Sequence, residues 1–400
     1  MKKLTALVLA LCMALGLAAC GGSKDTGSAA GSTAAASGDT VKIGVFEPQS
    51  GDNGAGGKQE ILGVQYANSV APTVEIGGKT YNVKLEIVDN ESSNDKAVSA
   101  ASQLVSKGVS MVLGSYGSGV SIAASDTFKN AGIPAMGITC TNPAVTAGNT
   151  HYFRACFIDS FQGPVLANYA YDNLKVKKAY CLSKLGDDYS GGLVSYFTKQ
   201  FEKKGGQVVK AEFPEGNSDF TSYIANAKKE GCGVFYAPIS IEAAQLVINQ
   251  AASQGLGMPL LAGDTWDSNV ILEAAKGTDV EIDVTTFYAD GTNKDFEQKI
   301  KDWINGDSTN LKNNGGNDTL SAVTVMGYDA YMVALEALKA AGSTDPAAVM
   351  KALPTVSYDG ITGTISFDET GDAKVKTAYV KTVDTKTGTW VGGGSVTMDE

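Results

Sequence analysis

Two short runs of small polar residues follow apolar segments, and their composition suits the binding of a carboxylate. In the run 114–118 (GSYGS), Ser118 can cap a helix that begins there. A helix start presents unpaired N–H groups and a partial positive charge, and the Ser118 hydroxyl would add a donor. In the run 139–143 (TCTNP), Asn142 and Pro143 suit the N-cap and first position of a short helix. The alternative is that Ser118 only caps its own helix.

The residues needed for catalysis or for a metal site are scarce. His151 is the only histidine, and no CxxC or HExxH motif occurs. A Ser–His–Asp relay would have to use His151, and nothing around it resembles a nucleophile elbow. Lys58 follows a glycine-rich run but precedes Gln59, whereas a phosphate loop needs Ser or Thr there. We therefore expect no enzyme, no catalytic residue, no metal and no cofactor.

The first twenty residues resemble an export signal that ends in a lipid-attachment site. Lys2 and Lys3 precede an apolar stretch over 4–17, and the run 17–20 (LAAC) matches a bacterial lipobox. This resemblance implies a signal peptide over 1–19, lipid on Cys20 and an extracytoplasmic, membrane-anchored protein. The plain alternative is a signal peptide with a chance cysteine. Residues 20–39, rich in Gly, Ser, Ala and Thr, predict a flexible tether.

Composition bounds the number of domains and the partners. A chain of 400 residues with 43% hydrophobic residues can form about two domains. The net charge of −11 disfavours nucleic acid as a partner. Four cysteines remain after residue 20, and mostly apolar surroundings favour buried free thiols over disulfides. They are Cys140, Cys156, Cys181 and Cys232.

Short apolar strands alternate with helical segments along most of the chain. This rhythm predicts an α/β fold with parallel sheets covered on both faces, and it restarts after Phe161. The first unit is predicted as strands at 41–46, 83–88, 110–113 and 133–138 with helices at 59–70, 94–107 and 118–130. The second is predicted as strands at 178–182, 207–210, 233–236 and 259–262 with helices at 163–174, 191–205, 220–230 and 241–254. Near the end, 361–367 and 377–383 are expected to pair with each other.

An ordered set of motifs resembles the Leu/Ile/Val-binding proteins, which have the type I periplasmic-binding fold. The set covers the chain from Val41 to about Val383, and its order is more specific than any single motif. The motifs are 48–52 (PQSGD), 114–118 (GSYGS), 139–143 (TCTNP), 151–154 (HYFR), 159–163 (DSFQG), 187–192 (DDYSGG) and 217–220 (NSDF).

The resemblance implies two doubly wound Rossmann-like lobes joined by three crossovers, with the ligand between them. Lobe 1 would hold residues 40–160 and 289–372, and lobe 2 residues 161–288 and 373–400. The crossings are expected near Asp159, Tyr288 and Asp372.

The resemblance also implies roles in ligand binding. Ser118 would hold a carboxylate, while Thr141 would contact both ends of an amino acid, with Thr139 and Cys140 in the same loop. Tyr189 would face the cleft from lobe 2, and a carboxylate after the strand 259–262 would pair with the ligand's ammonium group. Asp264 is the first choice for that carboxylate and Asp267 the second.

Two positions depart from the family pattern around the ligand side chain. Gly56 stands where relatives often carry an aromatic residue over the ligand, and Ile239 or Ser240 stands at a second such position. Tyr116 is expected to fill the side-chain pocket instead. The departures leave the choice of amino acid open.

The leading hypothesis is a monomeric binding protein that captures a branched-chain or apolar amino acid and delivers it to an ABC permease with a cytoplasmic ATPase. The alternatives are a sensor that passes closure to a membrane receptor, or binding of a short amide, urea or carboxylate.

Overall fold

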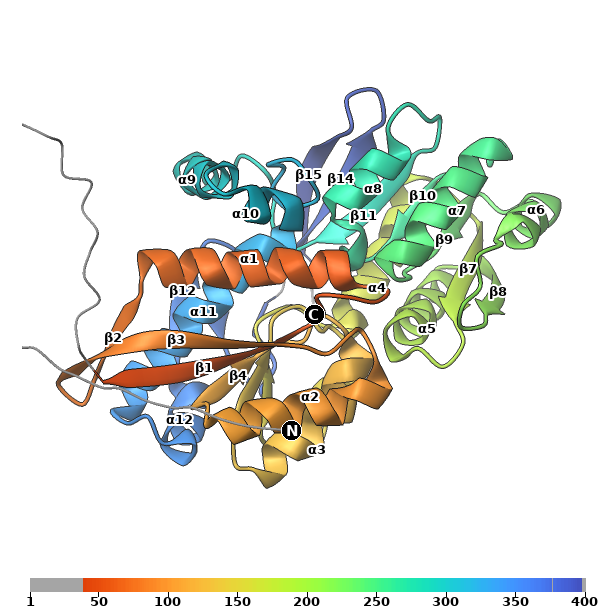
Figure 1. Cartoon of the computed structure of the whole chain (residues 1–400). Helices are drawn as coiled ribbons and strands as arrows, with labels where there is room; N and C mark the ends of the chain where they lie inside the picture. Colours follow the sequence, from red (N-terminus) through yellow and green to blue (C-terminus); the bar gives the residue numbers. More distant parts are fainter. Residues whose placement is uncertain (1–38, 376, 398–400) are drawn as a thin grey trace, which may run out of the picture. The chain divides into compact units, whose positions relative to one another are not determined.

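Two large β-sheets and one two-stranded sheet are found in the residues that this computed structural model describes, 39–375 and 377–397 (Figure 1). The expected signal peptide, Cys20 and the tether up to residue 38 lie outside the described residues. Within the described ranges, no helix is long and apolar enough to cross a lipid bilayer.

The first sheet has six strands in the order β2-β3-β1-β4-β5-β6. Its neighbours pair in parallel, except that β2 and β3 form an antiparallel hairpin. The strands are β1 (Thr40–Glu47), β2 (Thr73–Ile76), β3 (Lys79–Asp89), β4 (Met111–Leu113), β5 (Ala135–Gly137) and β6 (Tyr152–Arg154). Apolar residues recur along β1, because both faces of a parallel sheet are covered.

Helices cover the two faces of this sheet in separate layers. Val41, Ile43 and Val45 of β1 pack toward α1 (Gly54–Val70) and α11 (Ala322–Ala341), whereas Phe46 packs toward α2 (Asn94–Lys107) and α3 (Ser118–Asn130). Neighbouring strand residues point to opposite faces, so one strand serves both layers. Along the chain, α11 is preceded by α9 (Lys294–Asn305) and α10 (Ser308–Asn313) and is followed by α12 (Pro346–Ala352).

Glycines allow α1 and α11 to approach closely. A Cβ added to Gly63 would lie 1.9 Å from the Thr324 carbonyl oxygen, and one added to Gly327 would lie 2.4 Å from that of Glu60. Any larger residue at either position would push the helices apart. This contact holds α11, which is far along the chain, beside the first helix (Figure 1).

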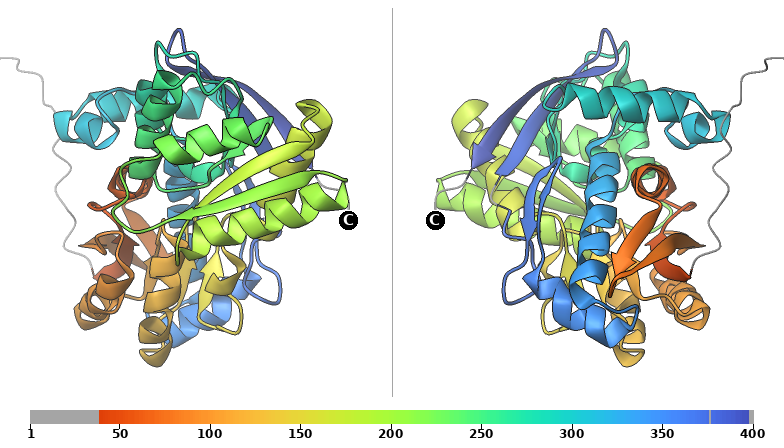
Figure 2. Two further views of the ribbon diagram at one scale, coloured as in Figure 1. Left: turned by 90° about the vertical axis from the view of Figure 1, so that its right-hand side faces the viewer. Right: turned by 90° about the vertical axis from the view of Figure 1, so that its left-hand side faces the viewer.

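The second sheet has seven strands in the order β15-β14-β11-β10-β9-β7-β8, and Figure 2 shows β14 and β15, in dark blue, at its edge. Its strands are β7 (Lys178–Lys184), β8 (Gln207–Phe213), β9 (Val234–Tyr236), β10 (Leu260–Ala262), β11 (Ile282–Thr286), β14 (Thr377–Asp384) and β15 (Thr389–Thr397). The helices around it are α4 (Asp159–Asn168), continued by a π-helix at Tyr169–Asn173, then α5 (Asp188–Lys203), α6 (Thr221–Lys229), α7 (Ile241–Ser253) and α8 (Asn269–Ala275). Together, the two sheets and their helices confirm the expected α/β class.

The expected pairing of 361–367 with 377–383 is wrong. Instead, β12 (Ser357–Gly360) pairs with β13 (Gly363–Ser366), and β14 pairs with β11 and β15. The chain that follows β13 does turn back on itself, through a bridge between Phe367 and Ala373, but this bridge ends before residue 377, where the second predicted segment begins. The strand β14 joins a sheet edge built from residues nearly a hundred positions earlier, which local sequence pattern does not reveal.

Candidate functional site

The start of α3 forms one wall of a polar pocket. Gly117 is the N-cap of this helix and Ser118 its first residue, so Ser118 does not act as the expected N-cap. Its Oγ instead accepts a hydrogen bond of 3.2 Å from the backbone N–H of Asn142. Ser118 is almost fully buried and lines the pocket, where the free N–H groups of the helix start favour an anion.

Tyr116 extends from this wall to the opposite side. Its backbone N–H donates to Glu47 Oε2 at 2.6 Å, and its hydroxyl donates to the Thr265 carbonyl at 3.1 Å. A Cβ added to Gly56 would lie 2.4 Å from the Tyr116 ring. The space that an aromatic side chain at position 56 would need is therefore already occupied by the Tyr116 ring.

A second loop, 139–146, lies beside the start of α3. Asn142 caps the short 3₁₀ helix Pro143–Val145 by accepting from the N–H of Ala144 at 2.8 Å, and Pro143 is its first residue, as predicted. Thr139 donates its hydroxyl proton to Glu60, and the Thr141 carbonyl accepts from the N–H of Asp159 at 2.9 Å.

Cys140 lies in this loop but directs its thiol into the protein. A Cβ on Gly137 would lie 2.1 Å from its Sγ, and burial raises the pKa of the thiol to about 11. Cys140 therefore contributes its backbone to the loop, while its thiol packs in the core. It is one of four buried, free cysteines among the described residues, as expected.

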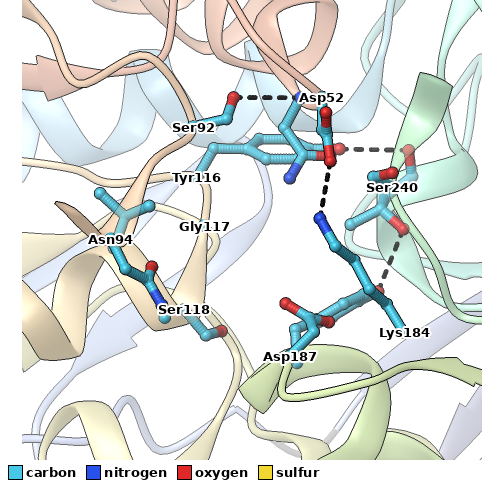
Figure 3. Close-up of a pocket in the computed structure, with 14 residues that line it drawn as sticks. Asp52, Ser92, Asn94, Tyr116, Gly117, Ser118, Lys184, Asp187 and Ser240 are labelled. Atoms are coloured by element: carbon cyan, nitrogen blue, oxygen red, sulfur yellow. Dashed lines mark hydrogen bonds and ion pairs between the residues drawn. The ribbon is translucent and has the colours of Figure 1, made fainter. Parts of the chain in front are cut away.

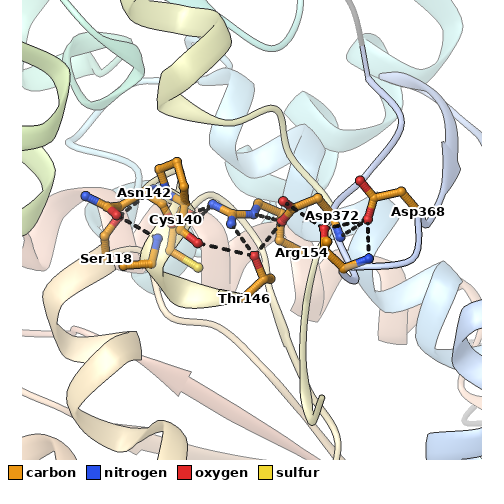
Figure 4. A network of polar contacts seen from close by, with 10 residues as sticks. Ser118, Cys140, Asn142, Thr146, Arg154, Asp368 and Asp372 are labelled. Carbon is orange, nitrogen blue, oxygen red and sulfur yellow. Dashed lines mark hydrogen bonds and ion pairs between the residues drawn. The ribbon is translucent and has the colours of Figure 1, made fainter. Parts of the chain in front are cut away.

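The buried guanidinium of Arg154 fixes the loop from behind (Figure 4). It donates to the carbonyls of Cys140 and Asn142 at 3.0 and 2.8 Å and to the Thr146 hydroxyl at 2.8 Å. Its Nε forms an ion pair of 2.7 Å with Asp372. A planar group with five donors can satisfy several oxygens at once, so the only arginine of the chain ties this loop to the segment before β14.

Asp264 stands on the opposite side, after β10, with 1% of its surface exposed. Its Oδ1 accepts from the Tyr189 hydroxyl at 3.0 Å and from Gln162 Nε2 at 2.8 Å. Burial raises the pKa of Asp264 to about 6 despite these two donors. No Lys or Arg in the described part of the chain forms an ion pair with it, so the carboxylate is ionised at neutral pH without a cation beside it.

Asp267, the second candidate, already has a cation. Its Oδ2 accepts from Lys381 at 3.0 Å, and Lys381 also lies 3.3 Å from Asp290. Lys381 is almost completely buried, so this network joins the loop after β10 to β14. Asp267 is thus paired with a cation, whereas Asp264 has no cation partner among the described residues.

The pocket between these walls contains some of the anticipated residues and omits others. Figure 3 shows Tyr116 and Ser118 on one side and Lys184 and Asp187 on the other. Tyr189 and Thr265 also line it. Thr139, Cys140, Thr141 and Asp264 lie behind this lining rather than in it.

Ser240, and not Ile239, lines the pocket. The Ile239 side chain packs in the core, and its carbonyl accepts from Trp266 Nε1 at 3.1 Å. An apolar residue that follows an apolar strand is more often packed in the core than placed in a binding site. A ligand contact by the Ile239 side chain therefore has no support from its position.

Sequence reasoning missed the ion pair that spans the pocket. Lys184, the last residue of β7, lies 2.9 Å from Asp52 in the loop after β1 and 2.5 Å from Glu215. Asn142 adds a bond of 2.6 Å from its amide to the Asp188 carbonyl. The position of Lys184 at the end of a strand could have marked it as a pocket residue. Its partner Asp52 could not be identified from the sequence, because Asp52 lies in a loop of the other sheet.

Comparison with known proteins places this arrangement in a family. The chain matches the model of the periplasmic binding protein family over residues 40–389. It is 31% identical over 340 residues to a Leu/Ile/Val-binding protein homolog of Brucella suis, covering 84% of this chain and 88% of that one.

Solved structures agree with the sequence comparison. A leucine-binding protein of Thermotoga maritima has a TM-score of 0.78 at 30% identity, covering 90% of this chain and 99% of that one. A branched-chain amino acid transporter substrate-binding protein of Streptococcus pneumoniae, in complex with isoleucine, has a TM-score of 0.78 at 26% identity, covering 90% and 100%. The resemblance in the motifs is thus confirmed, and the chain belongs to the periplasmic binding protein family of the Leu/Ile/Val-binding type.

Proposed function

We propose that this protein captures an amino acid, of the branched-chain or another apolar type, between its two sheets and delivers it to an ABC importer. The single observation that carries the proposal is that the site offers an anion-binding group and an unpaired carboxylate together. The start of α3 at Ser118 favours a carboxylate, and Asp264 offers an ionised carboxylate without a protein cation. An α-amino acid carries the complementary pair of charges.

Tyr189 connects the two ends of this proposed site. It lines the pocket near Ser118, and its hydroxyl binds Asp264. Thr139 and Thr141 lie in the loop whose N–H at Asn142 binds Ser118, directly behind the pocket lining. The Thr141 hydroxyl is buried without a partner among the described residues, so we expect it, with the Thr141 backbone and the Thr139 hydroxyl, to contact a ligand that extends from Ser118 to Asp264. Relatives named for leucine or crystallised with isoleucine support an apolar side chain.

Movement of two lobes is the second part of the proposal. Residues 40–160 and 289–372 would move as lobe 1, and 161–288 and 373–400 as lobe 2. The packing of α11 on α1 and the joining of β14 to β11 support this division. Ligand that contacts both lobes stabilises the closed form, which a permease can then recognise.

Attachment to the outer face of a membrane by lipid on Cys20 completes the proposal. Its support is the lipobox-like run 17–20 and the Gly- and Ser-rich run after it. A protein held in this way would stay near its permease while its binding domain remains in solvent.

Calorimetry on residues 21–400 tests the ligand class. Leucine, isoleucine and valine are titrated beside 4-methylpentanoate, which is leucine without its amino group, and benzoate. We expect binding of at least one amino acid and a much weaker response to 4-methylpentanoate. Ser118→Ala is expected to weaken binding only up to about tenfold, because backbone donors remain. Equal affinity for leucine and 4-methylpentanoate would exclude recognition of the ammonium group.

A further inference from the structure

Two buried carboxyl groups meet behind the proposed ligand site. Glu47 is the last residue of β1 and Glu60 lies in α1, and both side chains are fully buried. Each carboxyl group is close enough to shift the pKa of the other, and no Lys or Arg among the described residues forms an ion pair with either. Two adjacent carboxylates cannot both stay charged in such surroundings, so the pair retains a proton between them.

The remaining oxygens of the pair have direct contacts with the two loops of the site. Glu47 Oε2 accepts from the backbone N–H of Tyr116 at 2.6 Å, and Glu60 Oε1 accepts from the Thr139 hydroxyl. Glu47 Oε1 and Glu60 Oε2 are buried and have no hydrogen-bond partner among the described residues, so we place the shared proton between these two atoms. One buried pair thus contacts both the run 114–118 and the run 139–143.

The bond to Glu60 decides which way the Thr139 hydroxyl can act. A hydroxyl has one proton to donate and two lone pairs that accept. Because a carboxylate only accepts, Thr139 gives its proton to Glu60 and keeps its lone pairs for a donor on the ligand side. The ammonium group of an amino acid is such a donor.

We propose that the proton-sharing pair Glu47–Glu60 is a positioning device for amino-acid recognition, which orients the Thr139 hydroxyl as an acceptor and holds the loop at Tyr116; this inference rests on the proposed function. Loss of the shared proton would leave two buried negative charges side by side. Their repulsion would disturb both loops at once, so amino-acid affinity would fall with the loss of one proton.

The surroundings place this loss above neutral pH. Burial, followed by the nearby Glu60, raises the pKa of Glu47 well above its usual value, and burial raises the pKa of Glu60 to about 8. The other ionisable groups that act on the pair are Asp264, Tyr116 and Cys140. Burial keeps the pKa values of Tyr116 and Cys140 above this range, while that of Asp264 is about 6. Burial also raises the pKa of Asp159, whose N–H binds the Thr141 carbonyl, to about 8. Titration of Asp159 is common to wild type and the glutamine variants, so a ratio of their affinities isolates the pair.

Glutamine variants test the proposal because an amide copies a protonated carboxyl group. In Glu47→Gln, the amide carbonyl can accept from Tyr116 while the NH₂ donates to Glu60; Glu60→Gln offers the same pattern toward Thr139. The matched control is Glu86→Gln, on β3, where Lys84 and Lys107 bind the carboxylate and lower its pKa to about 2. Leucine affinity is measured by calorimetry from pH 6.5 to 9.5 for all four proteins.

For wild type and Glu86→Gln we expect leucine affinity to fall about tenfold per pH unit above about pH 8, relative to Glu47→Gln. The Gln variants at 47 and 60 should bind about two- to tenfold more weakly at pH 7, since a neutral amide is a weaker partner than a carboxylate. Above pH 8 they should show only the change in affinity that follows from titration of leucine's own amino group and of Asp159. Those titrations are common to all four proteins and cancel in the ratio.

A constant ratio of wild-type to Glu47→Gln affinity across this range would overturn the inference while leaving the proposed function intact. Absence of amino-acid binding by the wild type at every pH would overturn both. Urea unfolding without ligand is a second measurement, and it tests the shared proton even in variants that bind leucine too weakly for calorimetry. Wild-type stability should fall as pH rises toward about 8, and either Gln variant should reduce that fall; equal slopes would contradict a shared proton.

Discussion

Asp264→Asn should raise the stability of the ligand-free protein and lower its affinity for an amino acid. The buried carboxylate has a pKa raised from 3.8 to about 6, so above pH 6 its charge lowers the free energy of unfolding. At about 1.36 kcal/mol per pKa unit, the penalty is about 3 kcal/mol. The Asn carbonyl can still accept from Tyr189 and Gln162, so the ligand-free variant should be more stable at pH 7.5 by up to about 3 kcal/mol.

The size of this stability difference depends on pH in a defined way. Below about pH 4 the carboxyl group is protonated in both folded and unfolded protein, so wild type and Asp264→Asn should have equal stability. As pH rises from about 4 to 6, the wild type should lose stability relative to the variant, and above 6 the difference should stay constant. Urea unfolding at pH 3.5, 5 and 7.5 would reveal this pattern.

Affinity should change in the opposite direction. Loss of the ionised partner should weaken amino-acid binding by about 2 to 5 kcal/mol, which is roughly 30-fold or more. Binding of 4-methylpentanoate should change much less, because it lacks the ammonium group. The reasoning is refuted if the variant keeps full leucine affinity, or if its ligand-free form is less stable than wild type at pH 7.5.

Three further variants test other parts of the molecule. Cys20→Ser should release the protein from the membrane fraction with unchanged affinity for amino acid; equal retention in that fraction would contradict lipid attachment. Lys184→Met removes the partly exposed pair with Asp52 and should weaken ligand binding by no more than about 1 kcal/mol, mainly through faster dissociation in stopped-flow. Arg154→Met leaves Asp372 and two loop carbonyls without their donor and should lower the urea unfolding free energy by about 3 to 5 kcal/mol; a loss below 1 kcal/mol would show that water replaces the guanidinium.

Sequence patterns predicted the two helices α2 and α3, which cover one face of the first sheet, well. The structure gives α2 as Asn94–Lys107 and α3 as Ser118–Asn130, the bounds that the pattern predicted. Gly108, with a φ of 66°, ends α2 in the left-handed conformation that favours glycine. Amphipathic spacing and clear ends are local properties, and for that reason they can be read from one sequence.

Elements that depend on distant partners were less predictable. The helix α1 begins at Gly54 rather than Gln59, because its glycines pack closely on the preceding loop: a Cβ on Gly57 would lie 2.1 Å from the Pro48 carbonyl. The hairpin strand β2 was not anticipated at all.

Some residues of the candidate site could also be proposed from the sequence, whereas others depend on distant partners. The family resemblance and the position after a strand predicted Ser118 and Asp264 as ligand contacts, and both stay predictions. Glu47 and Glu60 carried no such signal, since a glutamate at a strand end and another in a helix are ordinary residues until the fold brings them together. Asp267 and Asp264 were distinguishable only once Lys381, over a hundred residues later, was seen beside one of them.

The contact between Gly56 and the Tyr116 ring makes the two positions interdependent during evolution. An aromatic residue cannot enter at position 56 while Tyr116 remains, and loss of Tyr116 alone would leave a void. Homologues should therefore exchange the two residues together, with one ring supplied from either position. The exchange would also decide whether the ring is hydrogen-bonded to the side of the second sheet, because the Tyr116 hydroxyl donates to the Thr265 carbonyl. Paired substitution at these two positions offers a route by which a lineage could reshape the pocket while Ser118 and Asp264 stay the same.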